Sequence, residues 1–573
     1  MNGEELALLG RTAVHLQPSQ IAHRARLRTQ LAALRRWPRL GQRLLAGVSP
    51  VAAGGWPTAF TPLDGIAPQR WPSLAELASG RITLLEVIRD LGEPVGWQHA
   101  DAPLLWRFHL HYWDWAWGLA AEPDRGAART VFGRLWRSWQ ASCGFGRGDA
   151  WLPYPAALRA WSWCGLHRDL VAGSDLEPDF LREVAAHAGF LRRHLESDLG
   201  GNHLIKDIKA LAGLGVFLRD ERLLARSLRQ LTAQLAVQVL PDGGHYERAP
   251  AYHCQVLGDL IDVADLLTAT GRAPGPELTL AIARMRRWLG AVLTPNGAVP
   301  LLNDGYPVPS ALVGALRPEP APDVPLVTLP DTGLIQATIG GWHLIADVGA
   351  PCPDELPGHA HADTLSCLLH VDGAPLLVDT ATSTYAAGPV RSYERSTAAH
   401  NTVELDGADS TEVWGAFRAA RRARVHGVSV SSANGKVTIE AEHDGYRRLP
   451  GRPVHRRRWS MTGAGLQVDD EVKGGRKHHF AVRWHLAPGA AVQLQGDGAL
   501  ITTVIGDFSV SISASAPIQL GVEHAMAATG LQATTLTPVL TCRADAVLPV
   551  RVTTCWRRGV LDKRSTNQAG KAV

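Results

Sequence analysis

The feature that most constrains the fold of this chain is a change of hydrophobic period near residue 300. Before that point, apolar residues recur at three- and four-residue spacing, which is typical of amphipathic helices. The clearest segments are 181–199, 204–218, 223–240 and 251–267, and earlier ones lie at 5–36, 103–120, 127–141 and 155–171. Gly or Pro separates several of them, so we expect an all-α array of paired helices.

The second part of the chain follows a Pro-rich stretch, Leu316 to Pro330, that has the composition of a linker. Short β-branched runs with Gly and Asp turns predict an antiparallel sandwich of two sheets. These runs are 334–339, 342–346, 375–378, 402–405, 436–441, 466–468, 499–504 and 508–512. We therefore expect a helical domain (1–320), a β-sandwich domain (326–560) and a polar tail (561–573).

Composition favours a soluble globular protein. A chain of 573 residues that is 46% hydrophobic can bury a large core in at least two domains. The 58 basic and 54 acidic residues nearly balance, so we expect no nucleic-acid partner, although a local basic groove could hold an acidic polymer. Seven scattered cysteines without a CxxC pair favour a reduced compartment.

The first ten residues carry two glutamates, where a signal peptide would be basic, and their apolar stretch is short. This pattern predicts neither a secretory signal nor a membrane span. Cytoplasmic residence is the expectation, with a periplasmic or exported location as the alternative.

Tryptophan is concentrated in one region, since ten of the nineteen lie from Trp97 to Trp163. The first interpretation is that these large aromatics fill the core between helices. The second is that some of them line a groove, because sugar rings stack their apolar C–H faces on indole. Candidates for such a groove are Trp106, His109, Tyr112, Trp151 and Tyr154.

Ionisable side chains cluster in the second domain at 358–363, 378–380 and 395–402. Three imidazoles and two carboxylates there can bind a divalent metal or transfer protons near neutral pH. In the helical domain, polar and aromatic residues gather where loops meet helices, at 200–204, 242–253 and 302–306. The structural alternative is that Asn202 caps a helix and that Tyr252 and His253 line an interior face.

In chain order, four motifs resemble those of the heparinase II/III-type polysaccharide lyases, which include alginate and glycosaminoglycan lyases. The motifs are Gly201 to His203, Tyr246 to His253, Gly358 to Asp363 and Ala399 to Val403, and the resemblance covers residues 95 to 490. It implies an incomplete (α/α) toroid followed by an antiparallel β-sandwich, with a polymer groove between them. It also implies β-elimination across C4 and C5 of a uronic acid, which leaves 4,5-unsaturated ends.

The resemblance also implies roles for individual residues. Asn202 corresponds to the residue that neutralises the substrate carboxylate, with His203 beside it. Tyr252 corresponds to the catalytic tyrosine and His359 to the catalytic histidine. Which of Tyr252 and His359 is the base and which the acid stays open, because it depends on the stereochemistry of the uronate.

A metal site is implied as well, because His361, Asp379 and His400 match the family's ligands, usually of zinc. We expect this zinc to be structural, holding the loop that presents His359.

The reaction itself asks for these residue types. The C5 proton of a uronate is α to a carboxylate, so the intermediate is an enolate that needs donors such as an amide or an imidazole N–H. A tyrosine can act as a base only where nearby cations or donors favour its phenolate. We expect an acidic polysaccharide as the partner, held by Arg107, Lys206, Arg248 and Arg395.

Two other functions compete with the lyase. Helical toroids also host glycoside hydrolases, for which the carboxylate candidates are Asp242, Glu247 and Asp304. A non-catalytic protein for glycan binding or exopolysaccharide assembly could keep the same fold. The sequence does not predict the polymer, the endo or exo mode, or the oligomeric state.

Overall fold

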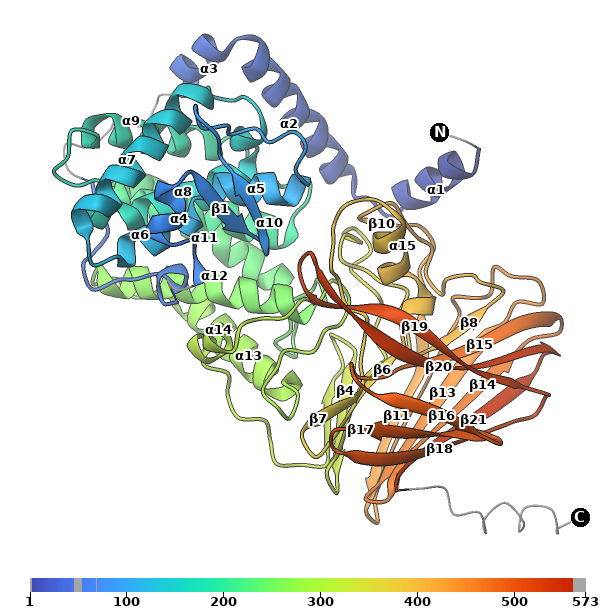
Figure 1. The fold of residues 1–573 in the computed structure, drawn as a ribbon. Coiled ribbons are helices and arrows are strands. Elements are labelled where there is room, and N and C mark those ends of the chain that lie inside the picture. The colour runs from blue at the N-terminus through green and yellow to red at the C-terminus, as the bar shows by residue number, and fades with distance from the viewer. Residues whose placement is uncertain (1–2, 46–53, 68–69, 560–573) are drawn as a thin grey trace, which may run out of the picture.

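The computed structural model describes residues 3–45, 54–67 and 70–559 (Figure 1). Helices make up the first domain, and the second consists mainly of strands. The helices of the first domain are α1 Gly3–Ala13, α2 Pro18–Arg36, α3 Pro38–Leu45, α4 Leu74–Ala78, α5 Leu104–Tyr112, α6 Trp117–Ala121, α7 Arg125–Ser142, α8 Pro153–Leu170, α9 Glu177–Leu191, α10 Gly201–Phe217, α11 Glu221–Gln238, α12 Pro250–Ala269, α13 Pro276–Val292 and α14 Ser310–Leu316. The predicted polar tail lies outside the described residues.

The predicted helical segments fall on helices, with three local differences. The segment 5–36 is broken before Pro18, because proline disfavours helical geometry at the residue that precedes it. The segment 103–120 is broken at Trp113, which has a left-handed backbone with φ of 62°. The segment 181–199 stops being helical after Leu191. We did not predict α13 or the small hairpin of β1 Arg81–Leu84 and β2 Val87–Asp90.

Helix α10 is central to the helical domain, since it packs against α8, α11 and α12. Glycines permit the close approach of its neighbours. A Cβ on Gly215 would lie 2.8 Å from the backbone nitrogen of Leu224, and one on Gly213 would lie 2.8 Å from the ring of Trp161. This packing sets the position of the first turn of α10, which carries Asn202 and His203.

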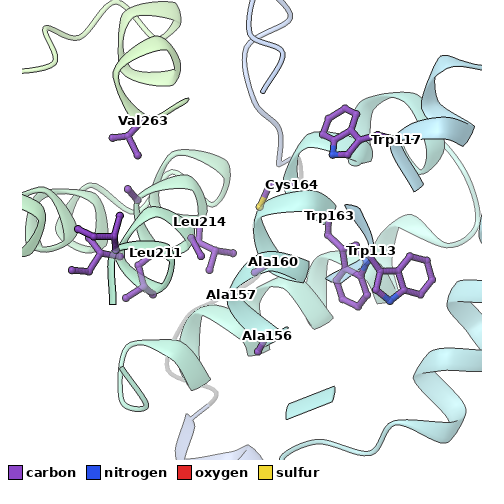
Figure 2. Close-up of a cluster of buried hydrophobic side chains, with 14 of the residues drawn as sticks. Trp113, Trp117, Ala156, Ala157, Ala160, Trp163, Cys164, Leu211, Leu214 and Val263 are labelled. Atoms are coloured by element: carbon purple, nitrogen blue, oxygen red, sulfur yellow. The ribbon is translucent and has the colours of Figure 1, made fainter. Parts of the chain in front are cut away.

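The tryptophan-rich region forms the core of the helical domain (Figure 2). Trp113, Trp139 and Trp163 are fully buried, and the guanidinium of Arg159 lies 4.5 Å from the centre of the Trp139 ring. Trp106 and Trp151 are each 1% exposed, so the expectation that they line a sugar-binding groove is wrong. Their size made burial in the core the more favourable outcome.

The second domain contains three antiparallel sheets in the described part of the chain. A five-stranded sheet has the order β3-β4-β5-β6-β7, a four-stranded sheet β19-β20-β15-β8 and an eight-stranded sheet β11-β12-β13-β14-β21-β18-β17-β16. The strands are β3 Leu326–Leu329, β4 Leu334–Ile339, β5 Trp342–Asp347, β6 Cys367–Val371, β7 Ala374–Leu377, β8 Val403–Leu405, β9 Val413–Trp414, β10 Arg418–Ala419, β11 Val425–Ala433, β12 Lys436–His443, β13 Val454–Thr462, β14 Gly465–Lys473, β15 Lys477–His485, β16 Ala491–Gln495, β17 Gly498–Thr503, β18 Gly506–Ala514, β19 Gln519–Gly530, β20 Ala533–Val547 and β21 Val550–Arg558. Strands β9 and β10 form a separate hairpin, and helix α15 spans Pro389–Arg395.

Two layers of sheet enclose the core of this domain. A bridge between Leu377 and Leu486 joins the five- and four-stranded sheets into one layer. Trp484 of that layer meets Trp556 of the eight-stranded sheet edge to face, with 5.8 Å between ring centres. The predicted antiparallel sandwich is therefore confirmed. None of the helices within the described ranges is both long and apolar enough to span a membrane.

We predict that Trp163→Ala lowers the free energy of unfolding by about 3–5 kcal/mol, because it removes a fully buried ring and leaves a cavity. Urea denaturation followed by circular dichroism measures the change. Trp37→Ala is the control, since that ring is 57% exposed and its loss should cost less than about 0.5 kcal/mol. Equal losses for the two variants would contradict the assignment of the core.

Candidate active site

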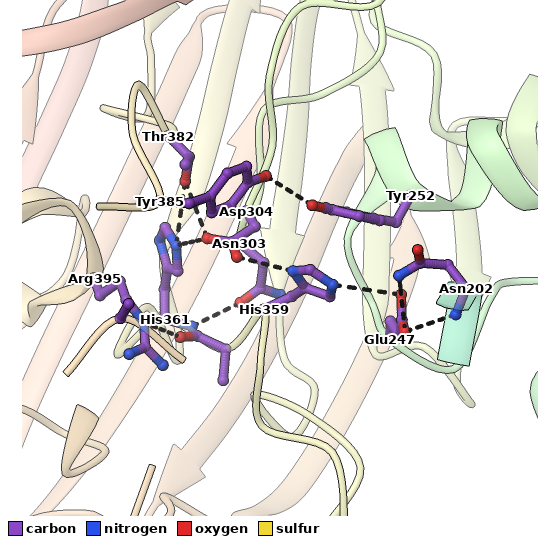
Figure 3. A network of polar contacts seen from close by, with 12 residues as sticks. Asn202, Glu247, Tyr252, Asn303, Asp304, His359, His361, Thr382, Tyr385 and Arg395 are labelled. Atoms are coloured by element: carbon purple, nitrogen blue, oxygen red, sulfur yellow. Dashed lines mark hydrogen bonds and ion pairs between the residues drawn. The ribbon is translucent and has the colours of Figure 1, made fainter. Parts of the chain in front are cut away.

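The predicted catalytic residues meet at the boundary of the two domains (Figure 3). Asn202 lies in the first turn of α10 and Tyr252 in the first turn of α12. His359 and His361 come from the loop between β5 and β6 of the sandwich. Side chains from widely separated parts of the sequence therefore lie together at this boundary.

Asp304, on the loop between α13 and α14, is the hub of the site. It is fully buried, and its carboxylate accepts hydrogen bonds from four side chains. The donors are Arg391 (Nη2 to Oδ2, 2.8 Å), His359 (Nδ1, 2.9 Å), His361 (Nε2, 2.8 Å) and Thr382 (Oγ1, 3.2 Å). Burial raises the pKa of Asp304, but the Arg391 charge and the two imidazoles outweigh it and hold the pKa well below its ordinary value.

The imidazole of His359 lies between two carboxylates. Its Nδ1 is bonded to Asp304, and its Nε2 lies 3.7 Å from Oε2 of Glu247. The ring also stacks on Tyr252, with 3.8 Å between ring centres and 30° between planes. His359 and Tyr252 are thus brought into direct contact from different domains.

Asn202 is bonded to a protein carboxylate. Its Nδ2 lies 3.2 and 3.0 Å from the two oxygens of Glu247, and its backbone N–H donates to the same group. Burial raises the pKa of Glu247, but His359, His245 and these bonds bring it below its ordinary value. Asn202 is 1% exposed, so contact between its amide and a substrate carboxylate requires Glu247 to move.

Gly201 makes this arrangement sterically feasible. Its φ is +56°, a region that favours glycine, and a Cβ there would overlap Oε1 of Glu247. The glycine in the Gly201-Asn202-His203 motif is therefore needed for the approach of Glu247 to the start of α10.

Tyr385 is a site residue that the sequence analysis missed. Its hydroxyl lies 2.8 Å from the hydroxyl of Tyr252. Burial, and then Tyr385, Tyr306 and Asp304, raise the pKa of Tyr252 well above its ordinary value. The only signal in the sequence was the position of Tyr385 between the motif residues Asp379 and His400.

His203 faces the site from the toroid side, with 36% of its side chain exposed. Its Nδ1 lies 3.2 Å from Glu196. Burial lowers the pKa of His203, but the charge and hydrogen bond of Glu196 outweigh it and raise the pKa above its ordinary value. The imidazolium form is therefore favoured at this position.

An aromatic row leads away from His203, and it contains three of the predicted groove residues. Ring centres are 4.2 Å apart for Tyr154 and His203, 5.9 Å for Tyr112 and Tyr154, and 4.7 Å for His109 and Tyr112. Tyr112 is 3% exposed, while Tyr154 and His109 are half-buried. The structure thus groups Tyr154, Tyr112 and His109 beside the site.

Three of the four cations expected to hold the polymer are already engaged. Arg107 pairs with Asp149 at 2.8 Å, and Lys206 pairs with Asp259 at 2.8 Å. Arg395 is 1% exposed and donates to backbone carbonyls, including that of Ala360 at 3.0 Å. Burial therefore contradicts the expectation for Arg395. For Arg107 and Lys206, whose side chains are 23% and 14% exposed and partly neutralised by their partners, contact with the polymer stays a prediction.

Arg248 differs from the other three expected cations. It is half-buried, and its Nη1 donates to the carbonyl of Ala350 in the other domain at 2.7 Å. It stays a candidate for contact with an anionic substrate.

The predicted zinc ligands lie close together. His400 Nδ1 is 2.7 Å from Asp379 Oδ2, and the rings of His361 and His400 are 5.3 Å apart. Within the described residues, no group of three or more His, Cys, Asp or Glu side chains is arranged to hold a metal. However, His361 Nδ1, His400 Nε2 and both carboxylate oxygens of Asp363 are buried without a partner. Imidazole and carboxylate are donors that zinc accepts, so the residues fit it in kind.

The carboxylates proposed for a glycoside hydrolase have other roles. Asp242 accepts hydrogen bonds from the backbone and hydroxyl of Thr332 at 2.7 and 2.8 Å, which ties together two loops. Glu247 and Asp304 are buried and bonded on either side of His359. A pair of carboxyl groups flanking an open sugar site, as hydrolysis requires, is not found among these three.

Comparison with known proteins agrees with the motifs. Residues 147–316 match the family model described as heparinase II/III N-terminus, and residues 321–550 match heparinase II/III-like, C-terminal. A curated relative from Caulobacter vibrioides (strain NA1000 / CB15N), named FtsZ-localized protein C, is 29% identical over 416 residues, which are 68% of this chain and 70% of that protein.

Solved structures share the fold. A crystal structure of heparinase III has a TM-score of 0.74 at 16% identity and covers 93% of this chain and 92% of its own. A mutant heparan sulfate lyase from Pedobacter heparinus has a TM-score of 0.61 at 15% identity, covering 94% and 90%. The predicted fold, a toroid of helices followed by an antiparallel sandwich, is confirmed.

We predict that Glu196→Gln lowers the pKa of His203, because the variant removes the charge that favours the imidazolium. An NMR titration of the His203 ring should give a pKa above 6.5 in the parent and a lower one in the variant. Because the raised pKa stabilises the folded protein at low pH, the parent's advantage over the variant should be complete below the unfolded value and disappear as pH rises through the folded one. An identical His203 titration in both proteins would contradict the pairing.

Proposed function

The chain belongs to the heparinase II/III-like family, and on that premise we propose that it is a polysaccharide lyase that cleaves a uronate-containing acidic polymer by β-elimination. The observation that carries the proposal is the stacked pair of Tyr252 and His359. The centres of a phenol ring and an imidazole ring from two domains are 3.8 Å apart there. The imidazole of His203, whose pKa Glu196 raises, and the amide of Asn202 lie in the first turn of α10.

The proposed reaction moves one proton from the substrate to the enzyme and one back. A base removes the proton from C5, and the electron pair of that C–H bond forms the C4–C5 double bond. The C4–O4 bond breaks, and an acid protonates the departing O4. Alginate and glycosaminoglycans both contain uronates and are the polymers to test first.

We assign the acid to Tyr252. Its raised pKa keeps the phenol protonated in the empty site, so it has a proton to give near neutral pH. In the structure the Tyr252 hydroxyl donates to that of Tyr385, 2.8 Å away. Transfer to O4 requires the Tyr252 hydroxyl hydrogen to turn toward the substrate, after which the Tyr385 hydroxyl can rotate and donate to the phenolate.

We assign the base to His359. Its Nδ1 is directed at Asp304, so Nε2 is the nitrogen that can accept the C5 proton. After the transfer, the ring lies between the carboxylates of Asp304 (2.9 Å from Nδ1) and Glu247 (3.7 Å from Nε2).

The enolate that forms at C5 needs positive charge beside the substrate carboxylate. His203 supplies it, since Glu196 favours the imidazolium and a third of the side chain is exposed. Asn202 holds Glu247 next to His359, and it can reach a substrate carboxylate only if Glu247 moves.

Zinc is also part of the proposal. His361, Asp379 and His400 would hold it, with the unpartnered nitrogens of the two imidazoles as the free donors. Bound zinc would supply a fixed point that ties the His361 loop to the sandwich. The proton transfers assigned above use only protein side chains.

A second candidate function is polysaccharide binding without cleavage. The name of the Caulobacter relative refers to localisation with FtsZ, and a protein of the same fold need not be a catalyst. Binding of a polyuronate without any unsaturated product would support it over the lyase.

We predict that Tyr252→Phe lowers kcat by about a hundredfold or more, because the phenylalanine ring keeps the packing but has no proton to transfer. Ultraviolet absorbance of the new C4–C5 double bond measures the rate. Tyr446→Phe is the matched control, since it removes the same atom from a buried tyrosine whose hydroxyl donates to Val403 within the sandwich. A Tyr252→Phe enzyme that works at the parent rate would exclude the tyrosine from the mechanism.

We predict that His361→Ala lowers both the zinc content and the melting temperature, because a ligand that binds the native state stabilises it. Elemental analysis and calorimetry measure the two effects. His343→Ala, at a buried histidine within β5, is the control and should retain zinc. Undiminished zinc in His361→Ala would show that the ligands are assigned wrongly.

A further inference from the structure

The N-terminal arm, residues 3–43, carries positive charge that the chemistry described above does not use. From residue 6 to residue 63 the sequence contains eight arginines and no Asp, Glu or Lys. This local excess contrasts with the near balance of charge in the whole chain. It also contrasts with Arg107, Lys206 and Arg395, whose charges are engaged inside the protein.

Helix α2 of the arm begins beside the active site. The Nε2 of Gln20 donates to the carbonyl of Asp198 at 3.2 Å and to that of Glu355 at 3.3 Å. Asp198 precedes Asn202 by four residues, and Glu355 precedes His359 by the same number. Arg24 pairs with the carboxylate of Asp198 at 3.2 Å. The arm thus contacts both segments that carry the predicted catalytic residues.

Arginines continue along α2 away from this contact. Arg24, Arg28 and Arg35 are separated by four and seven residues, so they lie on one side of the helix. At a rise of 1.5 Å per residue they extend over about 16 Å. Figure 1 shows α2 running from the domain boundary to α3 at the far end of the helical domain, where Arg39 and Arg43 follow.

These arginines are available to a ligand. Arg28, Arg35, Arg39 and Arg43 are exposed, and within the described residues none of them has a carboxylate partner. Screening by water weakens a single exposed charge, but a row of like charges produces a field that attracts a polyanion.

The arm also carries an aromatic surface. Trp37, between α2 and α3, is 57% exposed, and it is the one tryptophan in the described residues that is mostly accessible. It lines an open groove with Pro38, Arg39, Leu40 and Arg43. An accessible indole beside guanidinium groups suits the apolar C–H face of a charged sugar.

We propose that Arg28, Arg35, Arg39, Arg43 and Trp37, the arginine track, bind the part of an acidic polysaccharide that extends beyond the active site. The substrate class rests on the proposed lyase function. Continuity with the site favours a polymer over a flat anionic surface, because α2 contacts Asp198 and Glu355 through Gln20, close in sequence to Asn202 and His359, and the track begins farther along the same helix.

The test measures binding of size-fractionated heparin, used as a polyanionic probe, by calorimetry at low and high salt. The variant Arg28→Gln/Arg35→Gln/Arg39→Gln should bind long heparin chains at least about tenfold more weakly and with a smaller salt dependence. Its affinity for a heparin disaccharide should not change, since a disaccharide reaches only the site. Trp37→Ala should weaken binding of the long chains as well.

A matched control keeps the change in net charge constant. Arg222→Gln/Arg226→Gln/Arg229→Gln removes three exposed arginines from α11, which are spaced by four and three residues. This variant should bind long heparin like the parent. An equal loss in both triple variants would overturn the proposal, because net charge alone would then explain it.

Two further measurements separate this proposal from others. Binding of the parent to phosphatidylglycerol vesicles, lost in the track variant while heparin binding persists, would overturn it and assign the track to a membrane surface. If the parent cleaves no polyuronate but the track variant still loses affinity for long heparin, the track is supported and the lyase function fails.

Discussion

The buried carboxylate of Asp304 is the interaction on which the arrangement of the site depends. It lies on the loop between α13 and α14 of the helical domain, and its partners Arg391, His359 and His361 all belong to the sandwich. A buried charge is costly unless it is paired and hydrogen-bonded. The guanidinium of Arg391 and the imidazoles of His359 and His361 together supply the charge and the hydrogen-bond donors that this carboxylate needs. Their bonds to Asp304 therefore hold the sandwich loops in position against the toroid.

That constraint places the chemistry at the domain boundary. His359 is oriented by Asp304, and its ring lies on Tyr252 of the toroid. Tyr252 in turn is bonded to Tyr385 of the sandwich. Neither domain alone holds both Tyr252 and His359. A movement of one domain against the other would therefore separate the proposed acid from the proposed base, which makes the interface a requirement of the mechanism.

The comparison of expectation with structure shows where sequence reasoning succeeded and failed for particular residues. Hydrophobic period predicted the helices and strands well, because period reflects which side of an element is buried. The groove role of Trp106 failed, since a large indole gains more from core packing than from exposure. The ion pairs of Arg107 and Lys206 were not predicted, because their carboxylate partners are distant in sequence and close only in the fold.

Local hydrophobic period and short motifs are properties of neighbouring residues, so they were enough to predict the two-domain organisation and the residue types of the site. They placed Asn202, His203, Tyr252 and His359 in named segments. The fold was needed to show that the carboxylate of Glu247 accepts hydrogen bonds from the amide of Asn202, that Tyr385 contacts Tyr252, and that Arg28, Arg35, Arg39 and Arg43 have no carboxylate partner within the described residues. The physical reason is that hydrogen bonds and charge pairing depend on distances of a few ångströms between residues far apart in the chain, and no local pattern encodes these distances.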